Sequence, residues 1–147
     1  GRWEAFRDAA MPALNLRYLT AIILLDGGLD FVSAQSLERM AQDEAVQALM
    51  ARVAIRHDPG QEISPPAPRP ESARVTVTLQ GGHRETAFVP HVLGYPTHPM
   101  SRADVEAKAM ALMTPALGRE RAGAVVAAAA EVEALPAGSA LIELIAR

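Results

Sequence analysis

The pattern that most constrains the fold of this chain is an alternation of apolar and polar residues that runs into a double glycine. Between residues 75 and 79, valine or leucine alternates with threonine, which is the period of a strand with one buried face. Gly81 and Gly82 then supply a two-residue turn with positive φ, and residues 83–89 return as a second strand. The sequence therefore predicts a β-hairpin over residues 75–89.

Helical patterns lie on both sides of this hairpin. The predicted helices cover residues 14–25, 33–40 and 43–51 before it, and 102–113, 117–134 and 141–145 after it. Their predicted ends are Asp26-Gly27-Gly28 for the first helix, N-caps Ser33 and Asp43 for the next two, and Thr114-Pro115 for the fourth. Helices at both ends with strands between them predict an α+β fold with a small antiparallel sheet around a central hairpin.

Two further segments complete this prediction. Val53 and Ile55 alternate with polar or small residues and indicate a short strand. Four prolines between residues 61 and 70 favour an extended surface loop.

The segment from Gly94 to Lys108 joins the hairpin to the following helix. Its prolines at 96 and 99 fix φ and exclude a helix until after Met100. Ser101 is a good N-cap, and Asp104 stands where a carboxylate can reach back to it in a variant of the capping box. The segment is either a rigid connector that orients the helix or a loop that contacts a ligand.

Composition limits the classes of function. The 147 residues, half of them hydrophobic, suffice for one domain, which we place at 1–147 with 102–147 as a helical return segment. Fourteen basic residues against 17 acidic ones, with few aromatic residues, argue against a nucleic-acid partner. The apolar runs are too short to span a bilayer, which argues against a membrane partner. The absence of cysteine excludes disulfides and agrees with a cytoplasmic location.

The histidines do not form a recognisable metal-binding pattern. His57, His83, His91 and His98 include no pair separated by four residues on a helix, and no cysteine completes a zinc set. We therefore expect no metal site, and we interpret His57 and His83 as surface loop residues.

An ordered set of motifs resembles the C-terminal part of the MmgE/PrpD family, which includes 2-methylcitrate dehydratase, cis-aconitate decarboxylase and iminodisuccinate epimerase. The motifs are the helix from Leu14 to Ala21 with Leu25-Asp26-Gly27, Asp43-x-x-Val46-x-x-Leu49, Arg52-Val53-x-Ile55, Asp58-Pro59, the segment from Gly94 to Lys108, and Leu117-Gly118-x-x-Arg121-Ala122. No single motif is diagnostic, but their order is.

The resemblance implies a type of enzyme. Its members are cofactor-free lyases and isomerases that move a proton beside a carboxylate of a small polycarboxylate, and their site lies between a large helical domain and a smaller α+β lid. This chain resembles the lid, and most of the family's proton-transfer groups belong to segments that it does not include. We therefore expect no cofactor, no turnover by the chain alone, and either a homo-oligomer or a partner helical subunit.

Two positions take a role from the resemblance. Tyr18 matches the family's lid tyrosine, which implies a catalytic hydroxyl that donates a hydrogen bond to a substrate carboxylate or assists proton transfer. The alternative is a packed tyrosine whose hydroxyl bonds the backbone. Asn15 stands where many members have serine and is the expected substrate-binding residue. His98 stands where asparagine is frequent, which suggests a hydrogen-bonding role in the connector.

Two hypotheses for the function remain. In the first, the chain is the lid portion of such a lyase or isomerase. In the second, it is a non-catalytic module, derived from that family, that binds a ligand or another subunit.

Overall fold

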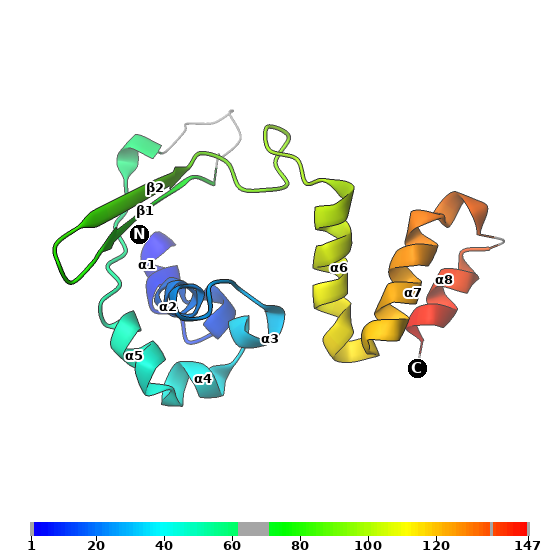
Figure 1. The fold of residues 1–147 in the computed structure, drawn as a ribbon, viewed down its shortest axis with the longest axis horizontal. Coiled ribbons are helices and arrows are strands. Elements are labelled where there is room, and N and C mark those ends of the chain that lie inside the picture. The colour runs from blue at the N-terminus through cyan, green and yellow to red at the C-terminus, as the bar shows by residue number, and fades with distance from the viewer. Residues whose placement is uncertain (1, 62–70, 136, 147) are drawn as a thin grey trace. The chain divides into compact units, whose positions relative to one another are not determined.

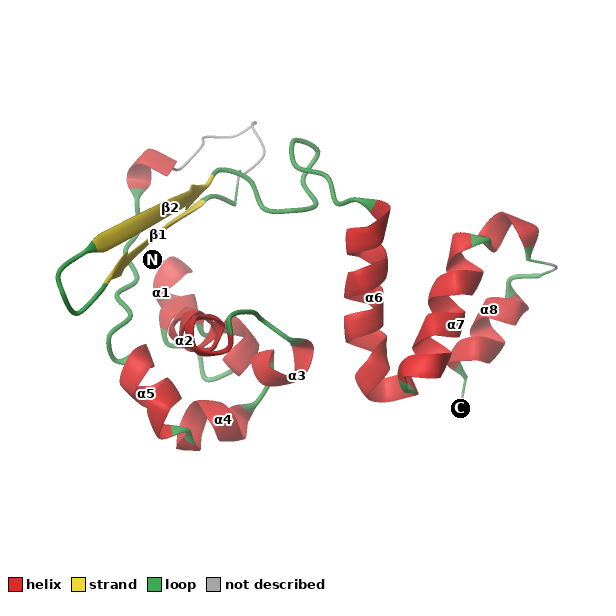
Figure 2. Ribbon diagram, in the orientation of Figure 1, coloured by secondary structure: helices red, strands yellow, loops and turns green. Residues whose placement is uncertain are grey.

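The computed structural model describes residues 2–61, 71–135 and 137–146 (Figure 1). It forms two compact units, one made of Gly1–His57 together with Glu106–Arg147 and the other of Asp58–Val105. Among the described residues, the first unit contains helices and loops, and the second contains the antiparallel sheet (Figure 2). The α+β class predicted from the sequence is confirmed. The single domain over 1–147 stays a prediction.

Short helices make up the N-terminal part of the first unit. They are α1 (Arg2–Arg7), the 3-10 turn η1 (Pro12–Leu14), α2 (Leu16–Asp26), α3 (Phe31–Ala34), α4 (Leu37–Gln42) and α5 (Glu44–Met50). Gly27 ends α2 with a φ of 73°, the left-handed conformation that glycine adopts without a steric penalty. The predicted end of this helix is confirmed.

The helix predicted over residues 33–40 with Ser33 as its N-cap is wrong. The segment forms two helices, α3 and α4, because two other side chains cap them. The Asp30 carboxylate accepts hydrogen bonds from the backbone N–H of Val32 and of Ser33, at 2.9 Å each. The Ser36 hydroxyl accepts from the backbone N–H of Arg39 at 3.0 Å and starts α4.

Packing of α2 on α5 creates the core of this region. Tyr18, Ala21 and Ile22 of α2 and Val46 of α5 are fully buried. The predicted N-cap of α5 is confirmed, since the Asp43 carboxylate accepts from the backbone N–H groups of residues 45 and 46. Residues 53–55 form no strand, because no described segment pairs with them, so that prediction is wrong.

The second unit contains the turn η2 (Pro59–Gln61) and the strands β1 (Ala73–Thr78) and β2 (Arg84–Val89), which pair antiparallel. The predicted hairpin is confirmed, but its turn has three residues instead of two. The backbone N–H of Gly82 donates to Leu79 O at 2.9 Å, and the Leu79 N–H donates to His83 O at 2.8 Å. Of the two glycines only Gly82 has positive φ, at 81°, as in a turn closed by a bulge. The loop predicted at 61–70 lies, apart from Gln61, outside the described residues.

The hairpin is more exposed than its alternation predicts. Val75, Val77, Ala87 and Val89 share one face in the observed register, yet Val75 is 50% exposed. A two-stranded sheet buries little by itself, and the other described parts of this unit are the short turn η2, the connector at 90–101 and the first residues of α6. The predicted buried face is therefore not buried within the unit.

The C-terminal helices are α6 (Arg102–Leu117), α7 (Arg119–Ala130), the turn η3 (Val132–Ala134) and α8 (Ser139–Ile145). The predicted stop at Thr114-Pro115 is wrong, since α6 continues through Pro115. Pro115 lies in the last turn, so its missing N–H affects only the end of the helix, and the Thr114 hydroxyl donates to Met110 O at 2.7 Å. Gly118, at a φ of 77°, separates α6 from α7 and divides the helix predicted over 117–134.

The predicted capping of α6 is confirmed. The Ser101 hydroxyl accepts from the backbone N–H of Asp104 at 3.1 Å, and the Asp104 carboxylate accepts from the backbone N–H of Ser101 at 2.9 Å. None of the described helices is both long and apolar enough to cross a bilayer.

Candidate functional site

The structure places Tyr18 in the core of the α2–α5 region. The side chain is fully buried, and its hydroxyl donates a 2.6 Å hydrogen bond to the carbonyl oxygen of Ser33 in α3. Burial raises the pKa of the Tyr18 phenol above its ordinary value, because a phenolate would lose its hydration there. This position agrees with the packing alternative, and the catalytic role of Tyr18 stays a prediction.

Asn15 lies one turn before Tyr18 and caps α2. Its side-chain oxygen accepts from the backbone N–H of Tyr18 at 3.0 Å, and its side-chain nitrogen donates to Ala9 O at 2.8 Å. The residue is 5% exposed. Both ends of the amide thus hold the backbone, and the substrate-binding role of Asn15 stays a prediction.

Arg39 connects the helices around these two residues. Its guanidinium donates two hydrogen bonds to the Asp26 carboxylate, at 2.6 and 2.8 Å, in the parallel geometry that arginine forms with carboxylates. The same group lies 3.5 Å from the Asp43 carboxylate and 3.4 Å from the Ser33 hydroxyl. Arg39, from α4, therefore contacts the end of α2, the helix α3 and the N-cap of α5.

The charges in this network stabilise one another. The hydrogen bond from Arg39 holds the pKa of the Asp26 carboxyl below its ordinary value. The Asp26 carboxylate in turn raises the pKa of the Arg39 guanidinium. The hydroxyl and the backbone N–H of Ser33 lower the pKa of Asp30. Asp26, Asp30 and Arg39 are thus ionised at neutral pH.

An open hollow lies beside this network. Its lining residues are Ser36, Glu38, Arg39, Gln42 and Asp43. Two carboxylates and one guanidinium line it, and that guanidinium already contacts two aspartates. A polycarboxylate anion would meet net negative charge there, so the hollow does not have the electrostatics of a site for such a substrate.

The connector brings two histidines and a tyrosine together. The His91 and Tyr95 rings stack with centroids 6.2 Å apart, and His98 Nδ1 lies 3.3 Å from the His91 carbonyl oxygen. The predicted hydrogen-bonding role of His98 in the connector is confirmed. His83 pairs with Glu85 at the exposed end of the hairpin, at 2.6 Å, as a surface residue.

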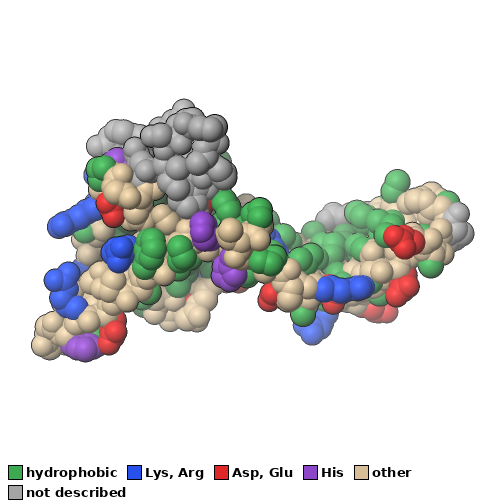
Figure 3. Space-filling view, turned by 90° about the horizontal axis from the view of Figure 1, so that it is seen from above, with side chains coloured by type: hydrophobic (Ala, Val, Ile, Leu, Met, Phe, Trp, Pro, Cys, Tyr) green, Lys and Arg blue, Asp and Glu red, His purple; other side chains and the backbone are tan. Residues whose placement is uncertain are grey.

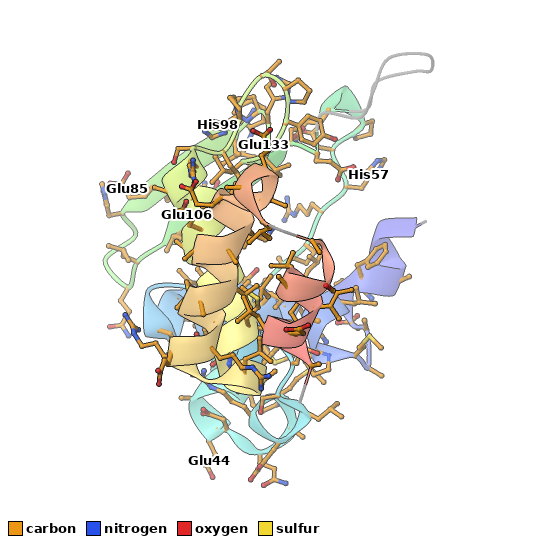
Figure 4. All side chains as sticks on the ribbon, turned by 90° about the vertical axis from the view of Figure 1, so that its right-hand side faces the viewer. Glu44, His57, Glu85, His98, Glu106 and Glu133 are labelled. Carbon is orange, nitrogen blue, oxygen red and sulfur yellow. The ribbon has the colours of Figure 1, made fainter. Side chains whose placement is uncertain are left out.

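Ionisable side chains lie scattered over separate elements. Figure 4 shows Glu44 directed away from the helices around it, and Glu85 and His98 on different segments of the second unit. Within the described residues, no three side chains of His, Asp or Glu type gather closely enough to hold a metal ion.

Sequence reasoning missed the network of Arg39. Its separation of 13 residues from Asp26 follows no helical or strand period, so no local pattern pointed to it. The spacing of four residues between Arg39 and Asp43 is the one local signal that could have indicated an ion pair.

The described residues form an α+β structure with an exposed hairpin and ionisable side chains spread over several elements. The model of the MmgE/PrpD C-terminal domain matches residues 5–132. The chain belongs to the MmgE/PrpD family and carries its C-terminal domain. No curated protein and no solved structure matches the chain.

Proposed function

We propose that the chain is the C-terminal lid portion of a cofactor-free lyase or isomerase that acts on small polycarboxylates, in the manner of 2-methylcitrate dehydratase, and that it is inactive alone. Membership of the MmgE/PrpD family is the observation that carries this proposal. In such an enzyme a helical domain, in the same or a separate polypeptide, supplies most of the proton-transfer groups. We place the complete enzyme in the cytoplasm.

The described side chains support the need for a partner. The hollow at Arg39 has the wrong charge for a polycarboxylate, and the Tyr18 hydroxyl is engaged with the backbone. A partner that adds cationic and proton-transfer groups would supply what the described residues around Arg39 and Tyr18 do not.

Apolar surface supports a partner as well. Leu16, Ile23 and Leu24 lie on the side of α2 that faces away from Tyr18, and they are 38%, 42% and 48% exposed. Large apolar side chains exposed together on one side of a helix indicate a contact surface. Hydrophobic side chains also reach the surface over the hairpin and the C-terminal helices (Figure 3).

Activity measurements test this proposal directly. The chain is assayed alone, and then joined to or mixed with a helical domain of the family, with 2-methylcitrate and cis-aconitate as substrates. We expect turnover only when the helical domain is present. Turnover by the purified chain alone would show that the site lies within this chain.

Tyr18→Phe separates the two roles of the tyrosine in that complete enzyme. A catalytic hydroxyl predicts a kcat/KM lower by about 10- to 1000-fold with the fold intact, since one such group contributes on the order of 1.5 to 4 kcal/mol. A packing hydroxyl predicts a lower melting temperature with unchanged kcat/KM. Asn15→Ser, the residue common in the family, gives the matching test for substrate binding through KM.

The second candidate function is a non-catalytic module that binds a ligand or another subunit. The exposed apolar side of α2 favours this alternative, because it provides a contact surface without chemistry. If the chain together with a helical domain turned over none of these acids but formed a stable complex, this alternative would replace the first.

A further inference from the structure

The helix α3 covers the Tyr18 hydroxyl. Ser33, in α3, supplies the carbonyl oxygen to which that hydroxyl donates, at 2.6 Å. Without α3 this hydroxyl would have no acceptor among the contacts that the structure gives it. The conformation of a four-residue segment thus decides whether the hydroxyl is engaged.

Polar contacts fix α3 in place more than apolar packing does. None of its residues is fully buried, and Phe31 and Val32 are 45% and 60% exposed. Two side chains from other helices contact Ser33. The Tyr18 hydroxyl donates to its carbonyl oxygen, and the Arg39 guanidinium lies 3.4 Å from its hydroxyl. A segment with little buried apolar area opens at a lower free energy than the core beneath it.

Arg39 contacts α3 from an anchored position. Its two hydrogen bonds to Asp26 anchor the guanidinium at the end of α2, so that the group has a fixed position from which to contact Ser33. Two parallel hydrogen bonds require the planar fork of arginine, which lysine does not have. The length of the Arg39 side chain alone would not fix this position.

We propose that α3 is a strap that opens locally to expose the Tyr18 hydroxyl, and that Arg39 is the positioning residue that keeps the strap closed. In the closed form the hydroxyl donates to Ser33. In the open form it is free to donate to a carboxylate of a bound substrate. This last step rests on the function proposed above, whereas the opening itself is a property of the chain alone.

Amide hydrogen exchange on the 147-residue chain, followed by NMR, tests the strap. The reporters are the backbone N–H groups of Ala34, Gln35 and Ser36, which donate to Asp30, Val32 and Ser33. The references are the N–H groups of Leu19 in α2 and Ala51 at the end of α5. The variants are Arg39→Gln, Arg39→Lys and Tyr18→Phe, with Glu38→Gln as a control that alters charge on α4 outside the contacts described.

A strap predicts that the reporters accelerate about ten-fold more than the references in Arg39→Gln and in Tyr18→Phe. Arg39→Lys should lie between Arg39→Gln and the unaltered chain, and Glu38→Gln should match the unaltered chain. Reporters that exchange at the rate of an unstructured peptide in the unaltered chain would overturn the proposal. Equal acceleration of reporters and references would also overturn it, because α3 would then open only with the core.

Chemical modification links the opening to the hydroxyl. In a Tyr95→Phe background, Tyr18 is the one remaining tyrosine, so nitration by tetranitromethane reports its access. We expect faster nitration in Arg39→Gln than in the unaltered chain, in parallel with the exchange of α3. Nitration that does not change while α3 exchanges faster would overturn the exposure of Tyr18. Neither measurement involves turnover, so failure here is distinct from failure of the proposed enzyme activity.

Discussion

The guanidinium of Arg39 donates hydrogen bonds of 2.6 and 2.8 Å to the carboxylate of Asp26, which lies 13 residues earlier at the end of α2. This ion pair joins two helices that have no other hydrogen bond of this kind between their described side chains. It also lowers the pKa of the Asp26 carboxyl from its ordinary value of 3.8.

The lowered pKa predicts a loss of stability in acid. A carboxyl with a lower pKa in the folded state stabilises the fold above its unfolded pKa, and this contribution is lost as the pH falls through the folded pKa. We expect Asp26→Asn to have a lower free energy of unfolding than the unaltered chain at neutral pH, and the difference to shrink as the pH falls below 3.8. Urea denaturation between about pH 2 and pH 7 measures it.

Arg39→Gln is the matched variant for this experiment, because it removes the other half of the same pair. The difference between its free energy of unfolding and that of the unaltered chain should shrink over the same range of pH. A deficit of Asp26→Asn that stays constant down to about pH 2 would contradict the assignment of the lowered pKa to the ion pair.

The two glycines of the hairpin turn differ in backbone conformation. Gly82→Ala forces alanine to a φ of 81°, which costs on the order of 1–2 kcal/mol in the left-handed region. Gly81→Ala is the control, because no heavy atom lies within 4 Å of the added Cβ and its φ is not in that region. Exchange of the Leu79 amide, which donates to His83 across the turn, should accelerate in Gly82→Ala and change little in Gly81→Ala. Equal acceleration of this exchange in the two variants would contradict the positive φ of Gly82 in the turn.

Arg121 joins α7 to α8. Its Nε donates to Leu144 O at 2.7 Å and its Nη2 donates to Ala146 O, so that it satisfies carbonyl groups at the end of α8. We expect Arg121→Met to destabilise α8 by about 1–2 kcal/mol, seen as roughly ten-fold faster exchange of the Ala146 amide. Arg119→Met removes a neighbouring exposed arginine and should leave that exchange unchanged. If the Ala146 amide exchanged faster in Arg119→Met than in Arg121→Met, the contact of Arg121 with α8 would not stabilise that helix.

The exposed apolar side of α2 predicts self-association of the isolated chain. Light scattering at high micromolar concentration should give a mass above the 15.6 kDa of one chain. Ile23→Gln should lower this mass, whereas Leu37→Gln, on α4, removes a similar apolar side chain from another helix and should not. A chain that is monomeric at this concentration would contradict the prediction.

Local patterns predicted those features that neighbouring residues decide among themselves. The capping of α6 by Ser101 and Asp104 needs only residues three apart, and the cap of α5 by Asp43 needs the next two amides. The hairpin follows from alternation and from the glycines between its strands. These predictions succeeded because each structure is determined by hydrogen bonds between residues that are close along the chain.

Predictions of helix boundaries failed where a residue other than the expected one caps or ends the helix. Asp30 and Ser36 both cap helices better than Ser33 does here, so one predicted helix became two. Pro115 was expected to end α6, yet a proline in the last turn removes a single donor and the helix continues to Leu117. Gly118 sets the boundary instead, through its positive φ.

The sequence by itself determined the family, the α+β class and the hairpin with helices on both sides, because motifs, caps and strand alternation involve residues that are close along the chain. Only the tertiary structure decided that the Tyr18 hydroxyl donates to Ser33 and that Arg39 pairs with Asp26. These partners lie 15 and 13 residues apart along the chain and meet because α2, α3 and α4 fold together. No periodic pattern encodes such contacts, because they depend on how the turns between the helices orient one helix against the next.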